Sequence, residues 1–533
     1  MRNLYRSLSA CAVLVASLGH GVSQAQQPVP EASGAAASFA INGFELTGDN
    51  PLRGEDSARV LAPFIGPNAT LATLQQASAA LEAELKAKGF ALYRVVLPPQ
   101  EVGAKVNLKI VKFVIGKITV TGQTNHSEAN IRASLPELGV GQTPNFRTLA
   151  VQTAIANENP DKQVQVALKE SDEADKIDVN LLVKDSKPWN FSASLSNMGT
   201  EATGRDRLAL VAGYSNLFDL DQQFSGAYTT SLERVSDVKQ LGLNYRIPLY
   251  QQRGVVGMSY TNSDVVGSFG SFNSTGAGQT FGLNYSYYLL PDGGRRSYVT
   301  IGLDEKLFNV AKINGVVDPL KFDRNSQPLT LGYTARVESD AAVWGYNTEL
   351  AVNLPGGSNN NLMAYQSEDA RITTANWKAL RGGANYLSTF ASGWLWSVRG
   401  QFQYSPDALI SGEQFGLGGV TSVRGTDERV LSGDSGLSTS IEITTLELRP
   451  GLRALGFVDA GWLYNQNAAA NSNKPATDHL LSAGLGLRYS AGAYAVTADW
   501  GRVLRGSVLP LANGSDIPQS GDQKLHVNFT ARF

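Results

Sequence analysis

Several features that would point to other protein classes are missing from this sequence of 533 residues. Its single cysteine, Cys11, lies in a segment that we expect to be removed, which excludes disulfide bonds and thiolate metal sites from the mature chain. Charged residues make up only 17%, and the net charge of −2 argues against a nucleic-acid-binding surface. No apolar run of about 18 residues, enough for a membrane-spanning helix, follows the N-terminal segment. The phosphate-binding pattern GxxxxGK[ST] is absent, and we expect no cofactor and no metal.

The first 25 residues have the pattern of a secretory signal peptide. The pattern consists of a positive end, an apolar stretch and a small-residue cleavage site: Arg2 and Arg6, residues 8–18, and Ser23-Gln24-Ala25. Residues 8–11 resemble a lipoprotein processing site, but most of the apolar stretch follows Cys11 instead of preceding it, which disfavours lipidation. A short linker, residues 26–38, comes next. An exported, cysteine-free and glycine-rich chain fits a bacterial envelope protein.

Residues 39–186 predict two tandem α+β modules, at 39–112 and 113–186. Three landmarks recur at an offset of about 74 residues: 44–48 with 118–122, 64–66 with 138–141, and 71–74 with 146–149. Each copy is predicted to run strand, helix, helix, strand, strand. In the first copy, leucines at 71, 74, 81 and 85 form one face of a helix between Thr70 and Gly89. Chance similarity between short turns is the alternative interpretation.

From Trp189 onward the sequence alternates between apolar and polar residues and loses helical periodicity. Residues 394–404 and the last eleven residues, ending at Phe533, show this alternation most clearly. Segments of about ten residues with aromatic ends are typical of a transmembrane β-barrel, and a soluble β domain is the alternative. We predict sixteen strands, an even number as in single-chain bacterial barrels, beginning near Trp189, Asp206, Gln222, Ser236, Arg253, Gln279, Ser297, Gln327, Val343, Thr374, Gly393, Leu437, Leu452, Leu480, Tyr494 and Gln523.

One predicted connection, residues 405–436, is much longer than the others and carries an isolated arginine. Its glycines at 416, 418, 419 and 425 allow the backbone to approach other groups closely, and Arg424 has a planar fork of donors suited to a carboxylate. In the thirteenth predicted strand, alternation turns Val458, Ala460 and Trp462 towards lipid and Asp459 towards the lumen. On spacing alone, a solvated Asp459 explains this pattern as well as a partner for Arg424.

These motifs resemble the TpsB family, the outer-membrane transporters of two-partner secretion, which are related to barrel insertases. The resemblance covers essentially the whole mature chain, and its sharpest motifs are Val423-Arg424-Gly425 and Phe457-x-Asp459-x-Gly461. It implies a mainly β fold, in which a 16-stranded transmembrane antiparallel β-barrel at 187–533 follows two periplasmic POTRA domains. It also implies that the long loop folds into the lumen and that Arg424 pairs with Asp459 to lock it there. Val423, Gly425, Phe457 and Gly461 would support this lock, and the terminal Phe533 would serve barrel assembly.

The resemblance further implies a function in export. The POTRA domains would recognise the N-terminal secretion domain of a partner exoprotein, such as a haemolysin, an adhesin or a contact-dependent toxin. The barrel would then pass the exoprotein unfolded across the bacterial outer membrane. Other implied partners are outer-membrane lipid and the barrel-assembly machinery during biogenesis, and we expect a monomer that binds no nucleic acid. Residues 184–189 would form the hinge between modules and barrel.

Two positions depart from the family pattern. Thr426 stands where the family usually carries an aromatic residue, which bears on how the loop tip packs. Residues 26–38 are too few and too rich in Pro and Ala for the full N-terminal helix that plugs the pore in many members.

Three other functions compete with export. Gly433-Asp434-Ser435-Gly436 resembles the nucleophile segment of trypsin-like proteases, which also requires a histidine and a buried aspartate. His126, His479 and His526 have no matching motif, so we predict that this segment is a turn and that the protein is not an enzyme. A barrel-assembly insertase commonly carries more POTRA domains. A passive porin or a ligand-gated receptor channel is the third alternative, and porins carry no POTRA domains.

Overall fold

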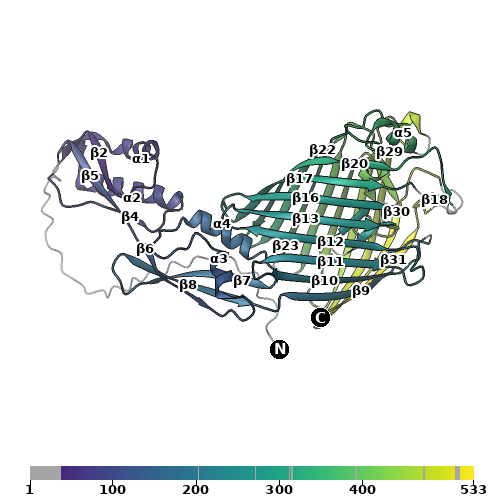
Figure 1. Cartoon of the computed structure of the whole chain (residues 1–533), viewed down its shortest axis with the longest axis horizontal. Helices are drawn as coiled ribbons and strands as arrows, with labels where there is room; N and C mark the ends of the chain where they lie inside the picture. Colours follow the sequence, from purple (N-terminus) through teal and green to yellow (C-terminus); the bar gives the residue numbers. More distant parts are fainter. Residues whose placement is uncertain are drawn as a thin grey trace. The chain divides into compact units, whose positions relative to one another are not determined.

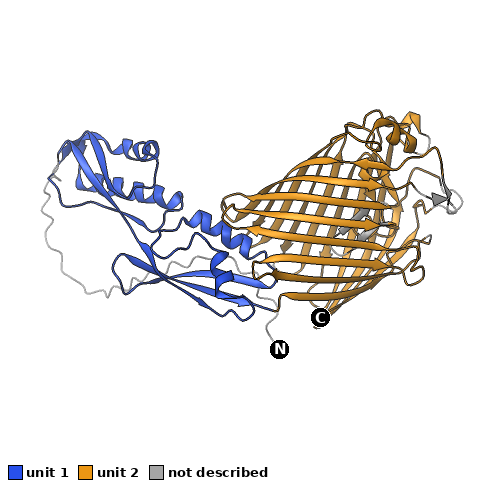
Figure 2. Cartoon of the chain, in the orientation of Figure 1, with its two compact units in different colours: residues 1–186 blue, residues 187–533 orange. Residues whose placement is uncertain are grey.

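The computed structural model describes residues 38–533, apart from 102, 202, 270–271, 276, 311, 314–315, 391–392, 472–473 and 511–515. The predicted signal peptide, the linker up to residue 37 and the expectation about an N-terminal plug lie outside the described residues. The chain divides into two compact units, Met1–Ser186 and Lys187–Phe533 (Figure 1 and Figure 2). None of the described helices is long and apolar enough to cross a bilayer.

The first module of the N-terminal unit packs two helices on a three-stranded sheet of order β2-β5-β4. Thr70 caps α2 as predicted, since its side chain accepts a hydrogen bond from the Thr73 N–H. The first predicted strand of this module is broken at Asn42, because residues 39–41 pair with β3 and form a separate short sheet. The elements are β1 (Phe39–Ile41), β2 (Gly43–Gly48), α1 (Gly54–Leu61), η1 (Ala62–Phe64), β3 (Gly66–Ala69), α2 (Leu71–Ala87), β4 (Tyr93–Val96) and β5 (Lys105–Lys112).

The second module repeats this arrangement with a sheet of order β6-β8-β7. Its elements are β6 (Val114–Thr121), α3 (Glu128–Ala133), α4 (Phe146–Ala156), β7 (Lys162–Glu170) and β8 (Lys176–Asp185), in the predicted order. Gly48 and Gly122 occupy equivalent turns with φ of +85° and +91°, and a Cβ there would lie 2.1 Å and 2.3 Å from the carbonyl oxygens of Ile110 and Val183. The repeated glycine therefore marks a backbone approach that only glycine permits.

The second unit is a closed antiparallel barrel (Figure 2). Within the described residues it has sixteen strands, because β20 and β21, which both pair with β17 and are separated by Gln327, form one interrupted strand. The strands are β9 (Trp189–Ser196), β10 (Arg207–Leu217), β11 (Gln222–Thr230), β12 (Gln240–Leu249), β13 (Gly254–Ser263), β16 (Gly278–Tyr288), β17 (Arg295–Phe308), β20 (Arg324–Ser326), β21 (Pro328–Glu338), β22 (Ala342–Asn353), β23 (Lys378–Thr389), β24 (Leu395–Tyr404), β27 (Ser435–Thr444), β28 (Leu452–Tyr464), β29 (Thr477–Ala491), β30 (Tyr494–Arg505) and β31 (Gln523–Arg532).

The barrel closes where β31 pairs with β9, from Asn528 opposite Ser196 to Arg532 opposite Ser192. The Phe533 N–H continues this seam by donating to the Phe191 carbonyl at 2.9 Å. We call the rim where β9 begins and β31 ends the proximal rim, and the opposite one the distal rim. Connections between the strands contain α5 (Leu362–Glu368), η3 (Ala468–Ala470) and the short hairpins β14 (Val266–Phe269) with β15 (Phe272–Thr275) and β18 (Lys312–Ile313) with β19 (Val316–Val317).

The two faces of the wall differ as the alternation predicts. On β28, Val458 and Trp462 are 47% and 51% exposed on the outer face, whereas Asp459 between them is fully buried on the inner face. The barrel is thus apolar outside and polar inside, as a membrane-spanning barrel requires.

Candidate functional site

The connection between β24 and β27 at the distal rim, residues 405–434, is packed against the inner wall of the barrel. We call it loop 6; it ends before the predicted residue 436, because Ser435 and Gly436 already belong to β27. It contains η2 (Ser411–Glu413) and a hairpin of β25 (Phe415–Leu417) and β26 (Leu431–Gly433). Three loop residues form an apolar cluster with wall residues of β28 and β29: Leu417, Val423 and Leu431 with Leu463 and Leu480. This contact buries apolar surface of the loop on the barrel.

The tip of loop 6 carries Arg424 to Asp459 on β28. Arg424 Nε donates to Asp459 Oδ2 and Nη2 donates to Oδ1, both at 2.7 Å, and the Arg424 backbone N–H adds a third bond at 3.1 Å. The Arg424 side chain is 2% exposed and that of Asp459 is 0% exposed. This bidentate, charge-assisted geometry is the strong form of the Arg–carboxylate contact.

Four further wall groups surround the guanidinium of Arg424, and one of them is Asp499 on β30, whose Oδ2 lies 3.9 Å from Nη1. Ser440 Oγ on β27 accepts from Nη2 at 3.0 Å, and Glu442 on the same strand lies 2.6 Å from Nη1. The ring centre of Phe457 lies 3.5 Å from the guanidinium carbon, a cation–π contact. Every side of this cation is therefore matched by an acceptor or a ring, which offsets the cost of burying it.

Glycines on the wall make room for the loop and its supports. A Cβ on Gly461 would lie 2.6 Å from the side chain of Leu417, and one on Gly484 would lie 2.4 Å from the ring of Phe457. The small residue in the Phe457-x-Asp459-x-Gly461 motif is thus explained by the seating of the loop hairpin. At the tip itself, Val423 is fully buried.

Thr426 closes the tip without an aromatic ring. Its hydroxyl donates to the Val423 carbonyl at 2.8 Å and accepts from the Gly419 N–H at 3.1 Å. The Gly425 N–H donates to Nε2 of His526 on β31 at 3.1 Å. No role for His526 was predicted, because a single histidine on a strand carries no motif.

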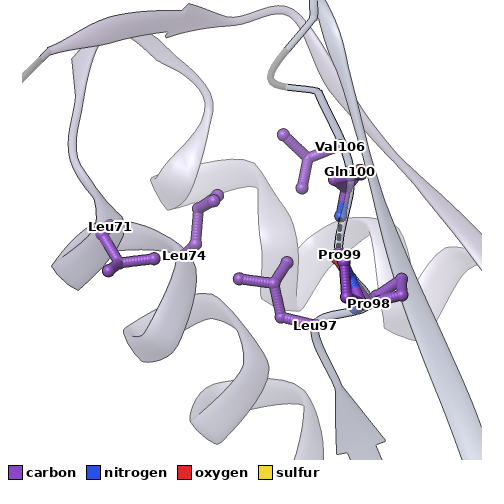
Figure 3. A pocket seen from close by; sticks show the side chains of 7 residues that line it. All are labelled: Leu71, Leu74, Leu97, Pro98, Pro99, Gln100 and Val106. Carbon is purple, nitrogen blue, oxygen red and sulfur yellow. Dashed lines mark hydrogen bonds between the residues drawn. The ribbon is translucent and has the colours of Figure 1, made fainter.

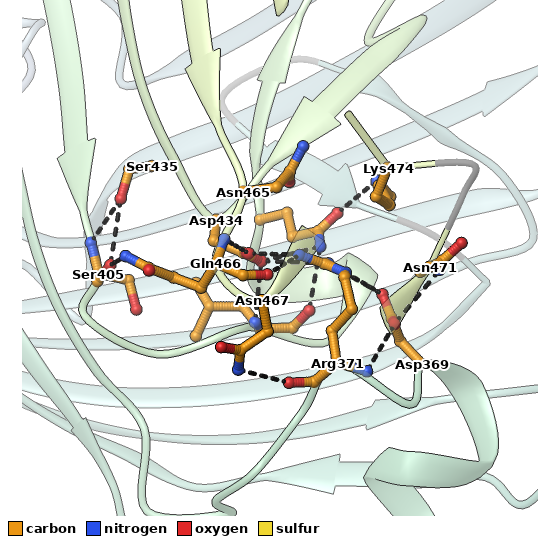
Figure 4. A network of polar contacts seen from close by, with 12 residues as sticks. Asp369, Arg371, Ser405, Asp434, Ser435, Asn465, Gln466, Asn467, Asn471 and Lys474 are labelled. Atoms are coloured by element: carbon orange, nitrogen blue, oxygen red, sulfur yellow. Dashed lines mark hydrogen bonds and ion pairs between the residues drawn. The ribbon is translucent and has the colours of Figure 1, made fainter. Parts of the chain in front are cut away.

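A second buried ion pair fixes loop 6 where it rejoins the wall at the distal rim (Figure 4). Asp434 Oδ2 lies 2.7 Å from Nη1 of Arg371, which belongs to the connection between β22 and β23, and both side chains are 0% exposed. Asp434 also accepts from the backbone N–H groups of Leu409 and Gln466, and Arg371 Nη1 also donates to the Gln466 carbonyl. Three distal connections therefore meet at one carboxylate.

The prediction that residues 433–436 form a turn is wrong. Gly433 ends β26, and Ser435 and Gly436 begin β27. The Ser435 hydroxyl is bound to the backbone of Ser405, accepting from its N–H at 2.9 Å and donating to its carbonyl at 3.2 Å. The segment holds the two ends of loop 6 together. The described residues contain no cluster of His, Cys, Asp and Glu that could hold a metal ion.

The first module carries a recess of about 280 Å³ that is open to solvent (Figure 3). It lies between the start of α2 and the segment that follows β4, and its lining is mostly apolar: Leu71, Leu74, Leu97, Pro98, Pro99, Gln100 and Val106. Leu71 is 59% exposed at its mouth. β4, at the edge of its sheet, leads directly into this recess.

Comparison with known proteins adds two family matches. Residues 175–489 match the family described as haemolysin secretion/activation protein ShlB/FhaC/HecB, and residues 39–112 match the ShlB-type POTRA domain. The outer membrane transporter CdiB of Escherichia coli is 22% identical over 453 residues, covering 83% of this chain and 76% of the relative. CdiB of Dickeya dadantii is 25% identical over 390 residues, covering 71% and 68%. The solved structure of CdiB from Escherichia coli superposes with a TM-score of 0.76 at 19% identity, over 95% of this chain and 93% of the other.

Proposed function

This chain belongs to the haemolysin secretion/activation family and is an outer-membrane transporter of two-partner secretion, and we propose that loop 6 is the removable obstruction of its export pore. The POTRA domains lie in the periplasm, so the distal rim faces the cell exterior. The exoprotein, captured on the POTRA domains, displaces the loop and passes through the lumen unfolded. Folding of the cargo outside the cell gives the transport its direction.

The contact between Arg424 and Asp459 carries this proposal. The loop is held in the lumen by a bidentate pair whose two side chains are almost fully buried. Separation of a buried ion pair leaves a buried charge without its partner, which is unfavourable. The pair therefore holds the loop in one defined position until a competing chain displaces it. We accordingly propose Arg424 and Asp459 as the lock and Val423, Gly425, Phe457 and Gly461 as its supports.

We propose that the recess beside α2 and the adjoining edge strand β4 receive an extended, apolar segment of the exoprotein. An edge strand offers unpaired backbone groups, and the recess offers a pocket for side chains. In cells that co-express the exoprotein, deleting residues 39–111 should abolish secretion while the barrel keeps its heat-modifiable migration on gels. Secretion at the normal level would show that the domains have another role.

A point substitution tests the recess more finely. Leu71→Glu places a charge at the mouth of the recess, where the Leu71 side chain is exposed and its loss leaves the module core intact. Secretion should fall, whereas Leu168→Glu, at an exposed leucine of the second module, should secrete normally. Equal secretion by the two variants would mean that the exoprotein is captured on a surface other than this recess.

We further propose that the protein has no hydrolytic activity, acts as a monomer, and depends on the barrel-assembly machinery for insertion, with Phe533 as the terminal recognition residue. The engagement of the Ser435 hydroxyl with the Ser405 backbone supports a structural role for that serine. Ser435→Ala should therefore leave any activity of the exported cargo unchanged.

A further inference from the structure

Loop 6 carries a buried carboxylate that the proposed lock does not include. Glu413, in η2, has a side chain that is 1% exposed. Its Oε2 lies 2.8 Å from Nη2 of Arg381 and its Oε1 lies 3.1 Å from Nζ of Lys306. Ser326 Oγ donates to Oε1 at 3.0 Å, and Gln403 Nε2 donates to the Glu413 backbone carbonyl at 3.0 Å. All four partners belong to the barrel wall.

The charged contacts of Glu413 and Arg424 lie on different parts of the wall and have opposite polarity. Glu413 is held by cations on β17 and β23, the seventh and tenth strands, close to the distal rim. Arg424 is held by anions on β27 and β28, the twelfth and thirteenth strands, deeper in the barrel. The loop thus bridges two arcs of the wall, with a carboxylate at the mouth and a guanidinium in the interior.

The wall around Glu413 contains replacement partners for both cations. Asp304 lies 3.9 Å from Nζ of Lys306, and Glu349 lies 3.6 Å from Nη1 of Arg381. If Glu413 withdraws, each cation keeps a carboxylate on its own wall, so neither is left unpaired. Within the described residues, by contrast, every hydrogen bond to the Asp459 carboxylate comes from Arg424. The contact at the mouth is therefore the easier of the two to release.

We propose that Glu413 is a second lock residue, a mouth latch that opens before the pairing of Arg424 with Asp459. This inference rests on the proposed function of loop 6 as the obstruction of the pore. Loss of its negative charge weakens the closed position of the loop but leaves the wall cations paired, so the open state gains population while the barrel stays folded. Glu413 is a positioning residue and contacts no transported chain in the closed state.

Single-channel recording of the purified full-length protein in planar bilayers tests the latch without any exoprotein. Glu413→Gln preserves the shape of the side chain and should raise the fraction of time spent in the open state by about tenfold. Glu338→Gln is the matched control, because Glu338 is also paired with an arginine but lies at the proximal rim, away from loop 6. Heat-modifiable migration verifies folding, and if Glu413→Gln does not assemble, the double variant Lys306→Gln/Arg381→Gln gives the same readout.

A charge exchange separates a latch from a merely structural contact. Glu413→Lys alone should open the channel further, and adding Arg381→Glu should return the open fraction towards the wild-type value. Arg424→Ala, measured in parallel, distinguishes failure of the Glu413 latch from failure of the proposal that loop 6 obstructs the pore. Altered gating in Arg424→Ala with wild-type gating in Glu413→Gln would overturn the latch alone. Wild-type gating in both would overturn the obstruction itself, and the latch with it.

Discussion

Gly425, at the tip of loop 6, and Gly501, on β30, approach each other so closely that neither position tolerates a side chain. A Cβ on Gly425 would lie 2.9 Å from the carbonyl carbon of Gly501, and one on Gly501 would lie 2.7 Å from the amide nitrogen of Gly425. The loop tip is therefore seated backbone against backbone, directly beside the residue that makes the ion pair. The glycine of the Val423-Arg424-Gly425 motif is as much a part of the seat as the arginine.

Gly425→Ala should unseat the tip. Gly425 has a φ of +93°, so alanine adds backbone strain of roughly 1 kcal/mol to the clash with β30. We expect a larger open fraction in bilayer recordings of the purified protein. Gly492→Ala is the matched control, because Gly492 also has a positive φ, +57°, but a Cβ there meets nothing within 4 Å. An equal rise of the open fraction in both variants would mean that strain alone, and not the contact with Gly501, causes it. A wild-type open fraction in Gly425→Ala would contradict the seating of the tip.

Arg424→Ala should leave the barrel folded and strongly reduce export of a co-expressed exoprotein. Removal of one partner leaves the buried Asp459 uncompensated, which destabilises the seated loop by about 3–5 kcal/mol. The loop then loses the single position from which the cargo displaces it. Export is measured as exoprotein in the medium, with heat-modifiable migration as the folding control. Normal export would count against the lock.

Exchanging the two charges, Arg424→Asp with Asp459→Arg, should restore export only in part. The new arginine reaches the new aspartate, but the Glu442 carboxylate, 2.6 Å from Nη1 of Arg424 in the native protein, now repels the loop. Adding Glu442→Gln should therefore improve the exchanged protein further. If the exchanged protein exports no more exoprotein than either single variant, the result would be evidence against a direct pairing of the two residues.

The second module of the N-terminal unit contains a pH-sensitive contact at its C-terminal end. Burial tends to raise the pKa of the Asp185 carboxyl, but hydrogen bonds from Thr124, Asn125 and His126 outweigh it and hold the pKa well below its ordinary value. A depressed pKa stabilises the fold above the unfolded pKa of about 3.9, and this contribution is lost as the pH falls through the folded value. We expect the contribution of Asp185 to stability to stay constant between pH 7 and 5 and to be lost only in stronger acid.

Asp185→Asn should lower the local stability by about 1–3 kcal/mol, because a charged acceptor of several N–H groups is removed. Hydrogen–deuterium exchange of the full-length protein at pH 7 should show faster exchange at residues 124–126 and in β8. Asp172→Asn, at an exposed site between β7 and β8, provides the control. Unchanged protection at residues 124–126 would show that the Asp185 carboxylate does not stabilise this segment.

Alternation in the sequence was enough to predict the barrel, because an outer apolar face and an inner polar face repeat on every strand. The starts of β11, β28, β30 and β31 were predicted to the residue. The prediction failed most at β23, which begins at Lys378 instead of Thr374, and at β12, which begins at Gln240 instead of Ser236. Before β12, Asp206 draws the chain into a loop by accepting hydrogen bonds from Ser231 and Leu232, and this tertiary contact overrides the local pattern.

The charged contacts of loop 6 were harder to predict from the sequence. Arg424 and Asp459 were paired through a family resemblance, since spacing alone left a solvated aspartate equally acceptable. Glu413 and Lys306 lie 107 residues apart, and Arg371 and Asp434 lie 63 apart, with no motif around either pair. A charged residue in a glycine-rich loop resembles a solvated one until the fold shows which wall it contacts.

The strands on either side of loop 6, β24 and β27, are hydrogen-bonded neighbours in the barrel. The loop consequently leaves and rejoins the wall at one place on its circumference, so it can swing outwards like a flap without separating any pair of strands. A passing polypeptide would then meet only the aqueous interior and never the acyl chains. The permeability barrier of the cell envelope would be interrupted only at the pore, and only for the duration of each passage.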